Sequence, residues 1–269
     1  YLLGNLYRKR GFSVCYDLTF YKEWGLDINN EFVRNFDILK AFPYLEFEEA
    51  SKLEVDVYRR EYFYGGNDGD IRTNDMSFLS LVPPIYLGGY YHFPSKQWLE
   101  TFQSLYRMVD GVLDKVNQIK CLEIDKCVDS VGVHVRRGDY IGLGLDLCGD
   151  EYYDEAIQKM KERVEDCRFY FFSDDAEYVK AHFGNVENSV IVSNGADEVE
   201  TDFLMMGKCR HHIIPNSTFG FWAAYLNESE NSVTICPRDF MSENGRMYQA
   251  DYPKNWIRIE NARGKQRFR

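Results

Sequence analysis

The stretch that decides the fold reads Val131-Gly132-Val133-His134-Val135-Arg136-Arg137-Gly138-Asp139-Tyr140. Its first half is a short apolar run typical of a buried strand, and its second half is a polar turn. Two guanidiniums, an imidazole and a carboxylate therefore stand where the strand ends. Because arginine presents a planar fork that fits phosphate oxygens, Arg136 and Arg137 predict a clamp for a diphosphate. A surface ion pair between one of these arginines and Asp139 is the simpler alternative.

The residues after this stretch alternate between short apolar strands and helical segments. We predict strands over 131–135, 168–172, 189–192, 212–214 and 232–235, separated by helices over 151–163, 176–183, 198–207 and 218–226. Such alternation, with nearly continuous apolar strands, is typical of a parallel sheet covered on both faces. We therefore predict a Rossmann-like domain over 128–269.

The preceding residues, 1–127, predict a separate domain that is rich in loops and aromatic residues. The chain opens on helix-spaced apolar residues that end at Gly11, and the alternating residues 12–18 predict a strand. Since the chain opens inside a helix, we expect the strand and turn that precede this helix to lie before Tyr1. A further amphipathic helix is expected over 95–109.

Polar clusters follow three of the predicted strands. Besides the turn with the two arginines, they are Ser173-Asp174-Asp175 and Asn216-Ser217-Thr218. Because parallel sheets bind ligands beyond the carboxyl ends of their strands, we expect the three clusters to converge on one edge. The last cluster opens a helix, where backbone N–H groups favour an anion, although capping of the helix explains one of its residues equally well.

Two further acids are candidates for binding a nucleotide. One of Asp174 and Asp175 is expected to cap the helix that follows, and the other could accept hydrogen bonds from a base amine or from ribose hydroxyls. Asp202 could act in the same way, although an exposed acid on a helix is the more common explanation.

Composition excludes several classes of protein. The formal net charge of −11 argues against general nucleic-acid binding, which requires a basic surface. No apolar run approaches the ~20 residues that span a bilayer. The seven cysteines are an odd number without paired spacing, so we expect reduced thiols in the cytoplasm.

Neither a Walker sequence nor a complete Gly-x-Gly-x-x-Gly turn is present. Asp68 and Asp70 compete with the arginines as a metal site for a diphosphate, and we favour the arginines without a metal.

Six motifs follow one another in the order and spacing of a known family. They are His134-Val-Arg-Arg-Gly-Asp-Tyr140, Phe172-Ser-Asp-Asp175, Asp202-Phe-Leu-Met-Met206, His212-Ile-Ile214, Asn216-Ser-Thr-Phe219 and Trp222-Ala-Ala-Tyr-Leu226. Together they closely resemble the bacterial α-1,2-fucosyltransferases of glycosyltransferase family 11. The likeness covers the C-terminal half and is weaker before it.

The resemblance implies a GT-B-like α/β architecture of two Rossmann-type domains that face each other across a cleft. The first, 1–127, would hold the acceptor, and the second, 128–269, would bind GDP-fucose. Such enzymes of polysaccharide biosynthesis transfer L-fucose to the 2-hydroxyl of a terminal galactose on a glycan, with inversion and without a cofactor or a required metal. The resemblance also allows peripheral association with membrane-bound glycan assembly at the inner membrane.

The resemblance also implies roles for individual residues. By analogy, Arg136 holds the β-phosphate, Ser217 and Thr218 close on the same diphosphate, and Asp174 binds the guanosine end. The catalytic set is then Arg136, Asp139 and His134, and the donor-binding set is Arg136, Arg137, Asp174, Asp202, Asn216, Ser217, Thr218 and Phe219. Asp139 is a candidate general base, and a structural ion pair with an arginine is its alternative. The base could also lie outside the sequence.

Two other functions remain open at this point. One is a different GDP-fucose-dependent fucosyltransferase, of the α-1,6 or the protein O-fucosyl type. The other is a non-catalytic module that binds a nucleotide sugar or a glycan. A titration with GDP alongside a fucose-transfer assay separates binding from turnover.

Overall fold

The computed structural model describes residues 1–26, 33, 35–64, 80–88, 115–192, 194, 198–226, 230–243, 246–248 and 252–261. Contacts within the chain divide it into two compact units. The first comprises Tyr1–Leu39 and Tyr44–Phe102, and the second comprises Lys40–Pro43 and Gln103–Arg269. The boundary predicted between 127 and 128 falls within the second unit. The predictions for 95–109, Asp68 and Asp70 lie outside the described residues.

Within its described residues, the first unit contains helices and a two-stranded sheet. Its elements are helix α1 (Leu2–Lys9), a π-helical turn (Phe20–Trp24), helix α3 (Lys52–Glu61) and the parallel strands β1 (Phe63–Tyr64) and β2 (Tyr86–Leu87). Helix α2 (Ile38–Ala41) lies where the residues of the two units meet in sequence. The predicted opening helix is confirmed, and it ends before Gly11, whose φ of +89° suits glycine.

The strand predicted over 12–18 is wrong. Within these residues, all of which are described, Tyr16 alone forms a β-bridge, with Glu49. The chain then turns away, because the carboxylate of Asp17 accepts a hydrogen bond from the backbone N–H of Thr19 at 2.9 Å. A Rossmann-type sheet in this half of the chain stays a prediction, since residues 65–79 and 89–114 are not described.

The second unit is built around a six-stranded parallel sheet. Its strands are β3 (Ser130–Val135), β4 (Arg168–Ser173), β5 (Ser189–Val192), β6 (His211–Ile213), β7 (Thr234–Pro237) and β10 (Ile257–Ile259). They lie in the order β10-β7-β6-β3-β4-β5, and every pairing is parallel. Counted along the chain, this is the strand order of the Rossmann fold. The predicted α/β class with a parallel sheet is therefore confirmed.

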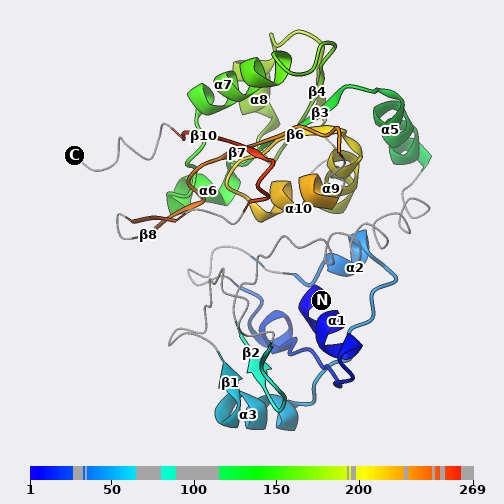
Figure 1. Ribbon diagram of the computed structural model, residues 1–269, viewed down its shortest axis with the longest axis vertical. Coiled ribbons are helices and arrows are strands. Elements are labelled where there is room, and N and C mark those ends of the chain that lie inside the picture. Colours follow the sequence, from blue (N-terminus) through cyan, green and yellow to red (C-terminus); the bar gives the residue numbers. More distant parts are fainter. Residues whose placement is uncertain are drawn as a thin grey trace. The chain divides into compact units, whose positions relative to one another are not determined.

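Helices cover both faces of this sheet (Figure 1). Helices α7 (Asp150–Lys161) and α8 (Ala176–Phe183) lie on one face, and α9 (Val199–Lys208) and α10 (Thr218–Leu226) lie on the other. Helix α5 (Lys115–Lys126) packs against α9. The short helix α6 (Gly138–Leu143) follows β3, and β8 (Met241–Glu243) pairs with β9 (Arg246–Tyr248) in an antiparallel ribbon.

The predicted strands and helices of the second unit are confirmed to within two residues at either end. The predictions omit α5, α6, β8, β9 and β10. Helix α6 opens on glycine and aspartate, which are weak helix formers, and β10 is only three residues long. Strand β10 forms because it pairs with β7, and for both elements the local sequence carries little signal.

Strand β3 is the centre of the hydrophobic core. All of its residues are buried, and the side chains of Val131, Val133 and Val135 are at most 1% exposed. They pack in one cluster with aromatic and sulfur-containing side chains such as Phe171 and Met160. Burying a large apolar side chain of this kind stabilises a fold by roughly 1.5–3 kcal/mol. The turn that follows β3 therefore extends from a rigid strand.

Neighbouring strands β3 and β6 are the point at which the strand order reverses. The chain leaves β3 for β4 on one side and leaves β6 for β7 on the other. Ligands of open α/β sheets bind in the crevice beyond the carboxyl ends of two such strands. We call this end of the sheet the carboxyl edge, and it carries the three predicted polar clusters.

Candidate functional site

The turn after β3, Arg136–Asp139, is called the arginine turn below. Arg136 forms an ion pair with Asp174, at 2.8 Å between Nη1 and Oδ2, and a second, very close one with Asp139. The side chain of Asp139 is 6% exposed, whereas that of Arg136 is 30% exposed. The ion pair that was the simpler alternative for Asp139 is thus present. A second acid, Asp174 in the turn after β4, holds the same guanidinium.

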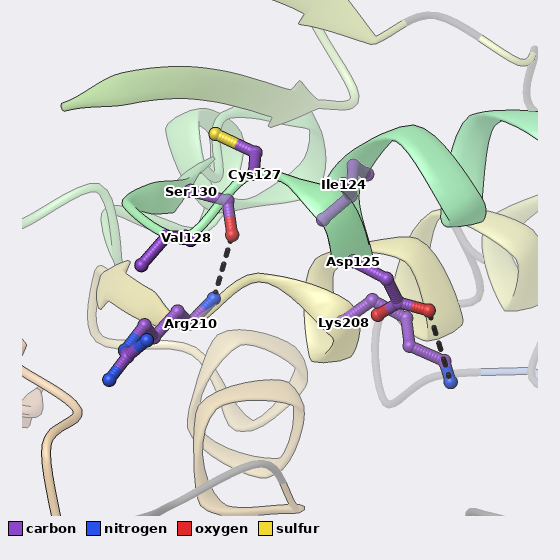
Figure 2. A pocket seen from close by; sticks show the side chains of 7 residues that line it. All are labelled: Ile124, Asp125, Cys127, Val128, Ser130, Lys208 and Arg210. Carbon is purple, nitrogen blue, oxygen red and sulfur yellow. Dashed lines mark hydrogen bonds and ion pairs between the residues drawn. The ribbon is translucent and has the colours of Figure 1, made fainter. Parts of the chain in front are cut away.

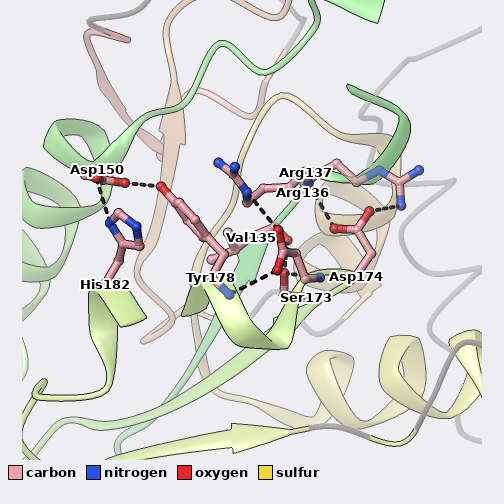
Figure 3. A network of polar contacts seen from close by, with 9 residues as sticks. Val135, Arg136, Arg137, Asp150, Ser173, Asp174, Tyr178 and His182 are labelled. Atoms are coloured by element: carbon pink, nitrogen blue, oxygen red, sulfur yellow. Dashed lines mark hydrogen bonds and ion pairs between the residues drawn. The ribbon is translucent and has the colours of Figure 1, made fainter. Parts of the chain in front are cut away.

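Arg137 is bound differently from its neighbour (Figure 3). Its backbone N–H donates to Asp174 Oδ1 at 2.9 Å, and its Nε donates to Asp175 Oδ2 at 3.2 Å. Its guanidinium carbon lies 3.5 Å from the ring centroid of Tyr178, which is a close cation–π contact. A Cβ at position 138 would lie 2.5 Å from the Asp174 carboxylate, so any residue other than glycine there would displace this acid.

The turn after β4 is tied directly to the arginine turn. The hydroxyl of Ser173 donates to the carbonyl of Val135 at 2.7 Å and accepts from the backbone N–H of Asp175 at 3.0 Å. Asp175 caps α8 by accepting the backbone N–H of Tyr178 at 3.0 Å. Asp174 is therefore the acid that is left over from capping, and it pairs with both arginines of the neighbouring turn.

The turn after β6 is neutral and largely buried. Asn216 donates from Nδ2 to the carbonyls of Leu145 and Phe240, at 2.9 and 3.0 Å, so its amide holds surrounding backbone. Ser217 is buried, and Thr218 is exposed at the first residue of α10. An exposed threonine thus stands at the start of a helix, a position that suits an anion.

His134 connects the arginine turn to α10. Its ring lies 4.8 Å from that of Phe219, and a Cβ at Gly220 would lie 2.9 Å from its Nδ1, so glycine allows the helix to approach. Burial, followed by the nearby charge of Arg136, lowers the pKa of His134 to about 3. The imidazole is therefore neutral at pH 7 and a poor proton acceptor. This supports a shaping role better than a role as a general base.

Asp202 lies in a different cluster, in the first turn of α9. Its Oδ1 accepts from Nδ2 of Asn194 at 2.6 Å, and Lys120 donates to the amide oxygen of the same asparagine at 2.8 Å. Burial raises the pKa of Asp202 to about 6. In the described residues its carboxylate is not bound to any of the three turns. The neighbouring Phe203 does reach them, with its ring 5.3 Å from that of Phe219.

Three residues beside the arginine turn were not predicted from the sequence. They are Tyr178, which lies under Arg137, and the pair Asp150 and His182, which hold Tyr178. Asp150 begins α7, far from α8 in sequence, so no local pattern links the three. An aromatic residue three positions after the capping Asp175 was the one available signal.

A hollow of about 260 Å³ lies at the opposite end of the same strands (Figure 2). It is lined by Ile124, Asp125, Cys127, Val128, Ser130, Lys208 and Arg210. Ser130 begins β3 and Arg210 directly precedes β6, so we call this end the amino edge. Lys208 lies 3.8 Å from Asp125, and the backbone N–H of Arg210 donates to Ser130 Oγ at 3.0 Å. The hollow is therefore remote from the arginine turn.

Among the described residues, no group of three or more histidine, cysteine or acidic side chains is arranged to hold a metal ion. None of the described helices has the length and apolarity to cross a membrane. All seven cysteines are free thiols, as their odd number and spacing predict.

Comparison with known proteins gives one family and a number of relatives, among them two from Escherichia coli and one from Homo sapiens. The sequence model of "Glycosyl transferase family 11" matches residues 56–260. An alpha-1,2-colitosyltransferase of Escherichia coli is 33% identical over 174 residues, which cover 61% of this chain and 59% of that protein. The O-antigen biosynthesis glycosyltransferase WbnK of Escherichia coli is 28% identical over 150 residues, which cover 53% of this chain and 50% of that protein. The galactoside alpha-(1,2)-fucosyltransferase 1 of Homo sapiens is 35% identical over 103 residues, which cover 36% of this chain and 28% of that protein. The chain therefore matches little more than half the length of its bacterial relatives.

Proposed function

The chain belongs to glycosyl transferase family 11, and we propose from this premise that it transfers L-fucose from GDP-fucose to the 2-hydroxyl of a terminal galactose on a glycan. The observation that carries the proposal is the fixed pair of guanidiniums at the reversal point of a Rossmann-type sheet. Nucleotide diphosphates bind at this place in the fold. The family and the sheet point to the same class of donor.

The donor phosphates would lie between the arginine turn and the start of α10. Arg136 would hold the β-phosphate, supported by Arg137, while Ser217 and Thr218 approach from the other side. The guanidiniums face three carboxylates, Asp139, Asp174 and Asp175, so the cluster is not basic overall. Binding would therefore rely on N–H groups that the acids leave available and on the backbone N–H groups of α10.

Fixed donors at this position suit the chemistry of the transfer. As the bond from fucose to GDP breaks, negative charge collects on the departing diphosphate. Donors that are already oriented stabilise that charge more than they stabilise the bound substrate, and so they lower the barrier. The acids around Arg136 and Arg137 supply this orientation. A required metal is not part of the proposal.

The acceptor hydroxyl must lose its proton, and Asp139 is the acid nearest to Arg136. Because its side chain is buried and paired with that arginine, its role in the proposal is to orient the clamp. Asp174, which pairs with both arginines, and Asp202, with its raised pKa, remain proposed contacts for the guanosine end. We expect the acceptor to be held by the first unit.

A donor other than fucose is the second candidate. It is favoured by the relative from Escherichia coli that is described as an alpha-1,2-colitosyltransferase. Both candidates use the same proposed diphosphate site, so they differ only in the sugar that is transferred.

The test is a transfer assay with the full-length protein. GDP-fucose and GDP-colitose are each incubated with a panel of galactose-ended glycans, and the linkage of each product is located by NMR. We expect a sugar on the 2-hydroxyl of galactose, with fucose as the better donor. Preference for colitose would support the second candidate. Tight GDP binding without any transfer would support a non-catalytic module, and a product at another hydroxyl would contradict the proposed linkage.

A further inference from the structure

The ring of Tyr178 lies between the guanidinium of Arg137 and the imidazole of His182. The guanidinium carbon of Arg137 is 3.5 Å from its centroid, and the imidazole of His182 stacks at 4.1 Å with an interplanar angle of 26°. Figure 3 shows the tyrosine between these two side chains. The ring therefore supports Arg137 from one direction and is itself supported from the other.

The position of Tyr178 is fixed at both ends of the residue. Its backbone N–H is bound by the capping Asp175, whose other carboxylate oxygen binds Nε of Arg137. Its hydroxyl donates to Asp150, and the second oxygen of Asp150 lies 2.9 Å from Nδ1 of His182. The chain thus holds the ring through α7 and α8 together. A flat surface of fixed orientation lies under the guanidinium as a result.

The two arginines of the turn differ in how their terminal nitrogens are used. Both terminal nitrogens of Arg136 are bound, by Asp139 and Asp174. Arg137 is bound through its backbone N–H and its Nε, which leaves its terminal nitrogens without a partner among the described residues. The stacking on Tyr178 is the contact that orients this part of Arg137.

We propose that Tyr178 is a positioning residue for the donor site, which holds the guanidinium of Arg137 in the orientation that binding of the GDP diphosphate needs. This inference rests on the proposed function of the arginine turn. The aromatic face, and not the hydroxyl, is the feature that acts. Asp150 and His182 serve to keep that face in place.

The experiment measures GDP affinity by calorimetry for the full-length protein and its variants. Tyr178→Leu removes the aromatic face, and we expect GDP to bind about 3- to 30-fold more weakly. Tyr178→Phe keeps the face, and we expect an affinity within about twofold of the original. Thermal unfolding checks that each variant is folded. If Tyr178→Leu does not fold, Tyr178→Met, which fills more of the same volume, takes its place with the same expected loss.

A double-mutant cycle shows whether Tyr178 acts through Arg137. In an Arg137→Gln background, Tyr178→Leu should have no further effect on GDP affinity, whereas a purely structural role would weaken binding in both backgrounds. The matched control is Arg168→Gln, which removes the cation from a similar pair with Tyr170 at the other end of β4 and should leave the affinity unchanged. The KM for the donor should rise with Tyr178→Leu more than kcat falls.

The outcomes separate this inference from the function on which it rests. If the original protein does not bind GDP, the proposed donor site is wrong and the inference falls with it. If the original protein binds GDP and Tyr178→Leu binds it equally well, only the role of Tyr178 is refuted. An additive loss in the double mutant also refutes it, because the tyrosine would then act independently of Arg137.

Discussion

The two ends of the central strands each carry a pair of basic side chains, but in very different surroundings. At the carboxyl edge, Arg136 and Arg137 are held by three carboxylates and by a tyrosine ring. At the amino edge, Lys208 lies 3.8 Å from Asp125, and the backbone N–H of Arg210 donates to Ser130. The hollow lies at the amino edge, and the fixed geometry lies at the carboxyl edge.

This difference shows which feature identifies the site. A hollow with cations is common on protein surfaces, whereas catalysis of group transfer requires donors that are oriented before the substrate arrives. Only the carboxyl edge of this sheet shows such orientation in its described residues. It is also the edge at which the strand order reverses. Substitutions at each edge test whether the two edges differ in function as they do in structure.

The largest expected effect comes from Arg136→Lys. Lysine keeps the positive charge but loses the planar fork that pairs with Asp139 and Asp174 and would hold a phosphate. We expect kcat/KM for fucose transfer to fall by about 10²–10³-fold, with little change in stability. Arg210→Lys makes the same change at the amino edge and should leave kcat/KM within about twofold. Equal losses in the two variants would remove the distinction between the edges.

The next effect tests what Asp139 does for the arginine turn. In Asp139→Asn the charged partner of Arg136 is lost while the size of the side chain is kept. We expect kcat/KM to fall by about tenfold, which corresponds to about 1.4 kcal/mol for a weakened charge-assisted hydrogen bond. The acid limb of the pH–rate profile should stay where it is. Disappearance of that limb, with intact GDP binding, would identify Asp139 as the general base instead.

A smaller effect concerns the approach of α10 to β3. A Cβ in Gly220→Ala would lie 2.9 Å from Nδ1 of His134 and 3.2 Å from Cβ of Ile214, so the helix must shift. We expect the free energy of unfolding in urea to fall by about 1–3 kcal/mol. Gly142→Ala is the control, because a Cβ there meets no atom within 4 Å, and it should stabilise the fold by about 0.5–1 kcal/mol. No destabilisation in Gly220→Ala would show that α10 is not closely packed on His134.

The strands and helices of the second unit could be predicted because their apolar residues repeat locally. The meeting of three polar turns followed from the rule for parallel sheets, and the structure brings them together through Ser173, Asp174 and Phe219. The partner of each charge could not be predicted. Asp174 and Tyr178 find Arg136 and Arg137 only after two strands pair, and local sequence does not record that pairing. The strand expected over 12–18 failed for a related reason, because one side chain, Asp17, redirects the backbone.

The smallest effect concerns Asp202, which lies on the carboxyl side but outside the three turns. Its pKa of about 6 in the folded protein exceeds the ordinary value of 3.8, so the folded state binds a proton more tightly. The tighter binding of this proton stabilises the folded state fully below pH 4, and the stabilisation is lost as the pH rises through 6. Asp202→Asn cannot ionise, so at pH 8 it should be more stable than the original protein by about 1 kcal/mol or less.

The measurement for Asp202 is urea unfolding at pH 4.5 and at pH 8. Glu200→Gln, on the same turn of α9, is the control for removing a negative charge and should show a smaller difference between the two pH values. A stability of Asp202→Asn that falls in parallel with that of the original protein would contradict the assignment. GDP affinity measured on the same variant tests the role in donor binding that the sequence predicts, since a clear loss would place Asp202 at the nucleotide.

The most direct test of the central claim is the structure of the full-length protein with GDP bound. We predict that the diphosphate lies at the carboxyl edge, within hydrogen-bonding distance of a guanidinium of the arginine turn and of the first residues of α10. GDP bound in the hollow at the amino edge, or bound elsewhere with both arginines still paired only to their acids, would contradict this account.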